Sequence, residues 1–160
     1  MEPTDKIQIF VMLGENLALG LANCRENRGH DDSLPYQSDV YAIRLEKTPI
    51  KVKLGSVWND GWGGDTNFER IPNLDEIHDK INELCGKHQM YYGGAPFASY
   101  NLIDTVDCMA EDFCTIMASP KAKKSVKAKN TSLMWKFDDS PDILARGGSG
   151  LPVFFSNVLL

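Results

Sequence analysis

The sequence of 160 residues lacks any long hydrophobic run, and this absence excludes one large class of protein. No apolar stretch approaches the roughly 18 residues that a membrane-spanning helix needs. Residues 1–20 also lack the basic start and apolar core of a secretory signal, so we expect a cytoplasmic protein with no membrane partner. A composition of 42% hydrophobic and 24% charged residues is typical of one soluble globular domain, here residues 1–160.

Cysteines are few and follow no pattern. Cys24, Cys85, Cys108 and Cys114 form no Cys-x-x-Cys pair, and their spacings match no common disulfide framework or zinc ribbon. We therefore predict reduced thiols. Cys85 and His88 could supply two zinc ligands, but no complete ligand set is evident, so we predict no metal.

The sequence motifs of several common enzymes and cofactor-binding proteins are also missing. There is no phosphate loop ending in Gly-Lys-Ser/Thr, no Gly-x-Gly-x-x-Gly before a helix, no EF-hand and no Gly-x-Ser-x-Gly elbow. We predict no cofactor and no assembled catalytic residues. The sequence leaves the question of enzymatic activity open and favours a protein without it.

Charge is unevenly distributed along the chain. From Pro120 onward, seven basic residues face three acids, which gives that quarter a charge of +4. Because the whole chain carries −5, residues 1–119 carry −9. The net charge argues against a protein that mainly grips phosphate backbones, but the basic segment could still contact them.

Alternating apolar residues in the first half predict an antiparallel sheet. Residues 6–13 and 16–25 flank Gly14 and Glu15, which can form a tight hairpin turn, although an amphipathic helix over 16–25 is an alternative. Residues 40–45 and 50–57 alternate as well, with Lys51 and Lys53 on one side. These patterns predict a four-strand meander with one solvated face. The polar residues 27–38 predict a surface loop.

The second half changes to helical periodicity. Asn73 and Glu76 have the spacing of a capping box, and apolar residues then recur at helical spacing, so we predict a helix over 74–85 that ends at a left-handed Gly86. A second helix is predicted from a cap at Ser99 or Asn101 to about Ala118.

The remaining elements complete a predicted α+β fold. Residues 131–137 and 152–159 are predicted as strands and residues 141–145 as a short helical turn. The expected architecture is a mainly antiparallel sheet, with the N-terminal four-strand meander plus C-terminal strands, and two helices packed on one face.

The segment from Val57 to Phe68 is the most distinctive stretch of the chain. Its glycines let the backbone approach a ligand closely, its tryptophans offer stacking surfaces, and its acids and amides offer oxygens. The same residues also suit a structural turn at a strand end. A loop rich in Tyr and Gly, residues 91–96, offers a second set of aromatic contacts. The predicted partner- or ligand-binding residues are Trp58, Asn59, Asp60, Gly61, Trp62, Gly63, Gly64, Asp65, Tyr91 and Tyr92.

A lysine-rich segment follows the second predicted helix, with five lysines in nine residues: Lys121, Lys123, Lys124, Lys127 and Lys129. We predict a solvated loop, because no aromatic residue or arginine interleaves the lysines. Electrostatic contact with nucleic acid or an acidic partner is one alternative. Neutralisation of the acids of the second helix is another; those acids, Asp104, Asp107, Glu111 and Asp112, are themselves predicted to form a solvated face.

The pattern Asn-Asp-Gly-x-Gly-Gly at 59–64, followed by an aromatic residue, resembles a pattern found in small proteins of phages, plasmids and integrative elements. The lysine-rich stretch that runs into a short apolar strand adds to this resemblance. It implies an accessory protein of a mobile element rather than a housekeeping enzyme, and it supplies no active site.

These observations lead to one main functional hypothesis and two alternatives. The main hypothesis is a non-enzymatic protein that binds and inhibits a host protein, such as a component of a defence system, with Trp58, Trp62, Phe68, Tyr91, Tyr92 and Phe97 as anchors. One alternative is a nucleotide-binding or sequestering protein that uses the backbone amides of residues 61–64. The other is a metal-dependent enzyme that uses Asp60, Asp65 and the helix acids. A homodimer is a further alternative, because the apolar C-terminal residues must be either paired in the sheet or buried between subunits.

Overall fold

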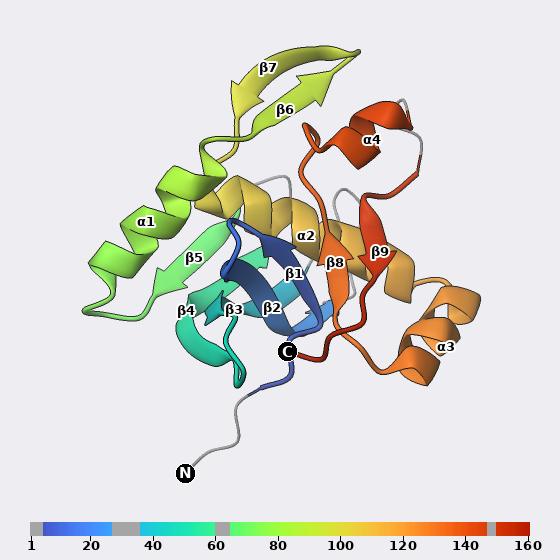
Figure 1. The fold of residues 1–160 in the computed structure, drawn as a ribbon, viewed down its shortest axis with the longest axis horizontal. Helices are drawn as coiled ribbons and strands as arrows, with labels where there is room; N and C mark the ends of the chain where they lie inside the picture. Colours follow the sequence, from blue (N-terminus) through green and yellow to red (C-terminus); the bar gives the residue numbers. More distant parts are fainter. Residues whose placement is uncertain (1–4, 27–35, 60–64, 147–149) are drawn as a thin grey trace.

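A seven-stranded sheet forms the centre of the computed structural model, which describes residues 5–26, 36–59, 65–146 and 150–160 (Figure 1). The first five strands pair in chain order and are all antiparallel. They are β1 (Ile9–Met12), β2 (Leu17–Glu26), β3 (Tyr36–Arg44), β4 (Ile50–Asn59) and β5 (Asn67–Arg70). The predicted meander is confirmed, and a fifth strand extends it. The predicted loop 27–38 is wrong for residues 36–38, which belong to β3, and its other residues lie outside the described part.

Two short strands from the C-terminal quarter complete the large sheet. Strand β8 (Leu133–Trp135) pairs with β1 in parallel, and β9 (Val153–Phe155) pairs with β8 in antiparallel orientation. The strand order is β5-β4-β3-β2-β1-β8-β9. The sheet is therefore mainly antiparallel, as predicted. Strand β1 is an interior strand, with β2 on one side and β8 on the other. The last strand is shorter than the predicted 152–159.

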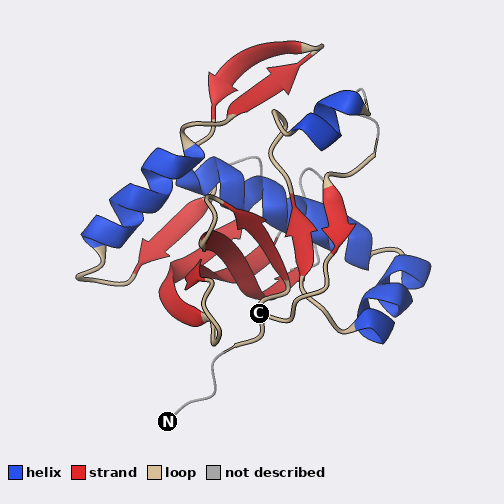
Figure 2. Ribbon diagram, viewed as in Figure 1, coloured by secondary structure: helices blue, strands red, loops and turns tan. Residues whose placement is uncertain are grey.

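Among the described residues, four helices and a separate hairpin lie around the sheet (Figure 2). The helices are α1 (Asp75–Cys85), α2 (Leu102–Met117), α3 (Pro120–Lys129) and α4 (Pro141–Ala145). The hairpin consists of β6 (Gln89–Tyr92) and β7 (Ala95–Ser99). None of the helices in the described part is both long and apolar enough to cross a membrane.

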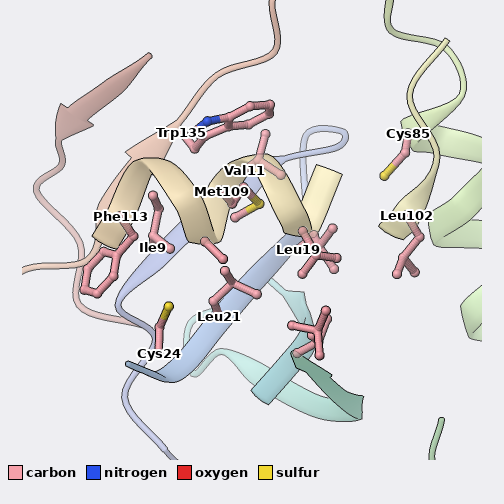
Figure 3. Packing of buried hydrophobic residues seen from close by; sticks show 14 of the residues in the cluster. Ile9, Val11, Leu19, Leu21, Cys24, Cys85, Leu102, Met109, Phe113 and Trp135 are labelled. Atoms are coloured by element: carbon pink, nitrogen blue, oxygen red, sulfur yellow. The ribbon is translucent and has the colours of Figure 1, made fainter. Parts of the chain in front are cut away.

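The main core lies between α2 and one face of the sheet. In Figure 3, side chains of β1 and β2 point toward the apolar side of α2, where Met109 and Phe113 lie. The side chain of Asn101 caps this helix by accepting a hydrogen bond from the Asp104 amide (2.7 Å), which confirms one of the two predicted caps. The Asn82 side chain of α1 accepts a hydrogen bond from the Leu102 amide (2.8 Å), so α1 is joined to the start of α2.

Two acids of α2 bind the sheet instead of facing water. Asp107 accepts a hydrogen bond from the buried Tyr36 hydroxyl (2.7 Å), and Asp112 accepts one from the buried Trp135 indole (2.8 Å). The predicted solvated acidic face is therefore wrong for these two residues. A carboxylate that accepts a bond from a buried aromatic donor fixes the rotation of the helix over the sheet, because that donor has no water available.

The other face of the sheet was predicted to be solvated, and this is only partly correct. Lys51 does point to that side, where its Nζ donates to the backbone carbonyl of Asp5 (2.9 Å). The centre of the face is nevertheless buried in a second apolar cluster: Ile7, Phe10, Ala18, Ala22, Tyr41, Ile43 and Leu160. The segments before β1 and after β9 close over it, with the Ile7 amide donating to the Leu160 carbonyl (2.9 Å).

Both predicted ends of α1 need correction. The helix begins after Leu74, and no side chain caps it, because Asn73 adopts a left-handed conformation (φ 67°) in the turn after β5. The predicted capping box is therefore not formed. Gly86 is right-handed (φ −64°), so the helix ends without the predicted left-handed residue. The helical body agrees with the prediction for 74–85.

The lysine-rich segment forms a helix, so the predicted loop is wrong. Ser119 caps α3 by accepting from the Ala122 amide (3.3 Å), Pro120 occupies the first turn, and Asn130 ends the helix in a left-handed conformation (φ 50°). These are ordinary start and stop signals of a helix. Val126 packs against the main core and holds α3 to the body.

We predict that Gly20→Ala lowers the free energy of unfolding by about 1–3 kcal/mol, the usual cost of overpacking a core. A Cβ atom at this position would lie 2.6 Å from Cδ1 of Ile43 and 2.7 Å from Cγ2 of Ile7, so the second apolar cluster would have to open. Urea unfolding measures the change. Gly14→Ala is the matched control, since nothing lies within 4 Å of its added Cβ. Equal stabilities of the two variants would contradict the prediction.

Candidate functional site

The β6–β7 hairpin projects from the body beyond the ends of α1 and α2 (Figure 1). Gly93 and Gly94 form its turn with φ angles of 59° and 85°, the left-handed conformation that a tight hairpin turn requires. The predicted Tyr/Gly loop is therefore a two-stranded arm, and we call residues 89–99 the arm. Its Tyr92 and Phe97 side chains are 82% and 63% exposed, and their rings meet edge to face at 6.5 Å.

The base of the arm is braced by the segment between β8 and α4. The Nδ1 atom of His88 lies 2.8 Å from Oδ1 of Asp139, whose other oxygen accepts a hydrogen bond from the Gln89 amide (2.9 Å). The imidazole also stacks on Phe137, with ring centroids 3.8 Å apart and planes 4° from parallel. The arm is thus held by contacts to residues about fifty positions later in the chain, which limits its motion relative to the sheet.

A cleft of about 630 Å³ lies between the arm and α4. Tyr91 contributes to it from the arm, and its amide lies 3.5 Å from Oδ2 of Asp138 on the opposite side. The lining residues are Tyr91, Gly93, Gly94, Asp138, Ile143, Leu144, Gly150 and Pro152. Because Leu144 is exposed as well, the arm and α4 together present apolar side chains around a concave surface.

The structure separates the two groups of binding residues that the sequence predicted. Tyr91 and Tyr92 lie on the arm, whereas Trp58 is half-buried on β4 of the large sheet, where it lies opposite Gln37 and Asn67. Asn59 is buried and Asp65 is exposed. The predicted residues Asp60, Gly61, Trp62, Gly63 and Gly64 lie outside the described residues, so the nucleotide-binding alternative at 61–64 stays a prediction.

A hydrogen-bond network centred on Asp107 lies beside Asn59. Oδ1 of Asp107 accepts hydrogen bonds from both Tyr36 and Thr66 (2.7 Å each), and the Asn59 amide nitrogen lies 3.4 Å from the Thr66 hydroxyl. Burial, and then the charge of Asp107, raises the pKa of Tyr36, so its hydroxyl stays protonated and remains a donor. Burial, Asp107 and Asp112 raise the pKa of Glu111 to about 6.

The hydrogen bonds of this network join α2 to β3 and to the residue before β5. Asp107 already accepts two strong hydrogen bonds, which hold it in a structural role. Within the described ranges, no group of three or more His, Cys, Asp or Glu side chains is arranged to hold a metal ion. All four cysteines are free thiols, and Cys85 is fully buried.

The five lysines of the basic segment all lie on α3 and are exposed. No ion pair between a lysine of α3 and an acid of α2 occurs among the described residues. The predicted alternative in which these lysines neutralise the second helix therefore finds no support in the structure.

The braces of the arm are the residues that sequence reasoning missed. Asp138 and Asp139 precede a Ser-Pro sequence, which is typical of a helix start and indicates only a local role. His88 follows a helix and carries no motif. Only the fold brings these residues together. Comparisons with protein-family models, with curated proteins and with solved structures found no match to this chain.

We predict that Asp139→Ala speeds hydrogen exchange of the Gln89 amide at least about tenfold, because that amide loses a charged acceptor worth roughly 1.5 kcal/mol. Amide exchange followed by NMR measures the rate. Asp142→Ala is the control, since Asp142 pairs with Lys136 and does not touch the arm. An unchanged Gln89 rate, or an equal change in the core strands, would show that Asp139 does not brace the arm.

The raised pKa of Glu111 makes stability depend on pH. Folding favours the protonated acid, so this contribution is full below the ordinary value of 4.5 and is lost as pH rises through about 6. A shift of this size is worth about 2 kcal/mol, which solvent screening at a half-exposed group reduces to about 1 kcal/mol.

We therefore predict that Glu111→Gln is more stable than the wild type by about 1 kcal/mol at pH 7.5 and gains less at pH 4. Urea unfolding of both proteins at the two pH values measures the difference. A gain that is the same at both pH values would show that ionisation of Glu111 is not its cause.

Proposed function

We propose that the protein is a non-enzymatic binding protein that engages a partner protein through the arm. One observation carries the proposal: Tyr92 and Phe97 are large, exposed side chains in mutual contact at the far end of a braced hairpin. Large aromatic residues dominate the energetics of interfaces, and a monomeric protein gains nothing from exposing two of them together.

The energetics favour this use of the arm. An aromatic side chain can bury on the order of 150 Å² in an interface, which corresponds to about 4 kcal/mol before the costs of association. Those costs are lower when the contact residues are already ordered. The bonds from Asp139 to His88 and Gln89 supply this order in the free protein.

The cleft between the arm and α4 makes the proposed binding surface concave. A protruding segment of the partner could enter between Tyr91 and Leu144 while Tyr92 and Phe97 lie against its flank. The partner that we propose is a host protein, and a component of a defence system is one such host protein. This identity is inferred from the resemblance of residues 59–64 and the lysine-rich segment to mobile-element proteins. Inhibition would follow from occlusion of the partner, and we propose that it takes place in the cytoplasm.

We predict that the double variant Tyr92→Ala/Phe97→Ala loses its partner while keeping its fold. Two exposed aromatic residues of this kind should together raise the dissociation constant at least about 100-fold. The measurement is affinity capture from a lysate of the encoding organism, followed by calorimetry with the protein that wild type retains. Thermal unfolding should change little, because neither side chain is in a core cluster.

Ile71→Ala/Ile103→Ala is the matched control, because both residues are large, apolar and exposed (37% and 39%) and lie outside the arm and both core clusters. It should retain the same partner. Equal capture by the double variant and the control would contradict the proposal. Sedimentation of the purified protein tests the homodimer: a dimer that the double variant disrupts would assign the arm to a second copy of this chain.

A further inference from the structure

The lysines of α3 form a charge cluster without internal compensation. Lys121, Lys124 and Lys127 follow one another at three-residue spacing, and Lys123 lies four residues before Lys127. Like charges at these spacings repel across a helix surface. Lysines in the first turn are also unfavourable next to the positive end of the helix dipole. In the described part of the chain, no carboxylate pairs with any of them.

One side of α3 forms a wall of a groove. A cavity of about 690 Å³ and a second of about 260 Å³ lie between α3, the end of α2, the residues just before β1 and the end of β2. They adjoin, because Gln8, Phe113 and Met117 line both. We call this continuous space the basic groove. Its cations come from three different parts of the chain: Lys6, Arg25, Lys123 and Lys127.

The cations of the basic groove keep their charge available. The Lys6 ammonium donates to the amide oxygen of Asn130 (2.8 Å), and the Arg25 guanidinium donates to the amide oxygen of Gln37 (2.9 Å). A neutral acceptor orients a cation but does not neutralise it. Glu26 is the single acid among the described lining residues. Four positive charges therefore line one concave surface, and hydrogen bonds orient two of them, Lys6 and Arg25.

We propose that the basic groove binds the phosphate backbone of single-stranded nucleic acid. Lysine ammonium groups bind phosphates as point charges, and each phosphate that a cation neutralises releases counterions and adds salt-dependent affinity. Three of the four cations are lysines. A single strand leaves its bases free to stack on aromatic rings beside the groove, whereas a double helix does not.

Aromatic surface lies close to α3 as well. Lys129 Nζ lies 4.9 Å above the ring of Phe155, which is exposed, and Lys136 and Arg146 lie over Phe154 (5.1 and 4.9 Å). The sequence argument against nucleic acid was that no aromatic residue interleaves the lysines. The fold supplies these residues from β9, more than twenty positions later, and bases can stack on such rings.

The test is binding of a fluorescent 20-nucleotide single strand by the full chain, followed by anisotropy over a range of salt concentrations. Four phosphate contacts predict a slope of about −2.8 for log affinity against log salt. In Lys123→Glu/Lys127→Glu, two contacts remain, so the slope should fall to about −1.4 and the affinity at least about tenfold at low salt. Circular dichroism checks that α3 still forms.

Lys80→Glu/Lys87→Glu is the matched control, because it makes the same change in net charge at exposed lysines on or just after α1, away from α3 (Figure 1). It should bind like the wild type. An equal loss in both double variants would overturn the assignment to the groove, and so would an absence of binding at low salt. Tighter binding of a duplex, or of a poly-glutamate peptide, would overturn the choice of single-stranded nucleic acid.

Discussion

Both candidate surfaces depend on one contact, the parallel pairing of β8 with β1. The Leu133 amide donates to the Gln8 carbonyl (2.8 Å), and the Ser132 hydroxyl donates to the carbonyl of Ile7, which is 125 positions away. This pairing holds everything after α2 against the N-terminal meander. Before β8 in the chain, α3 lies beside the segment that precedes β1 and forms one wall of the basic groove. After β8 in the chain, the next residues contact the base of the arm, where Asp139 binds His88.

The same topology keeps the two signs of charge apart. Two acids of α2 accept hydrogen bonds from neutral donors within the body, Asp107 from Tyr36 and Asp112 from Trp135. The lysines of α3 consequently remain unpaired within the described residues. Within the described residues, the acids of α2 and the lysines of α3 therefore form no ion pairs with each other. An anionic partner would be drawn toward the α3 end, which steers association.

Local sequence signals predicted most elements, because hairpin turns and helix caps act over a few residues. The meander and the Asn101 cap are examples. The lysine helix was missed because the charge run outweighed its own signals, Ser119, Pro120 and Asn130. The Asn73 cap failed because the turn after β5 fixes that residue in a left-handed conformation. Contacts between distant segments, such as His88 with Asp139, have no local signal, so neither the braced arm nor the basic groove could be predicted.

The arm and the groove would contribute differently to binding. Contacts to a phosphate backbone carry no sequence information and weaken steeply with salt, so the groove alone would give affinity without selectivity. Two ordered aromatic residues lose little entropy on binding and depend on the shape of the partner, so the arm would supply selectivity. The two surfaces lie at different ends of the molecule (Figure 1), and a partner on one leaves the other accessible. A protein partner that itself carries nucleic acid could therefore occupy both, and its affinity would then exceed that of either contact alone, because the second contact forms within one complex.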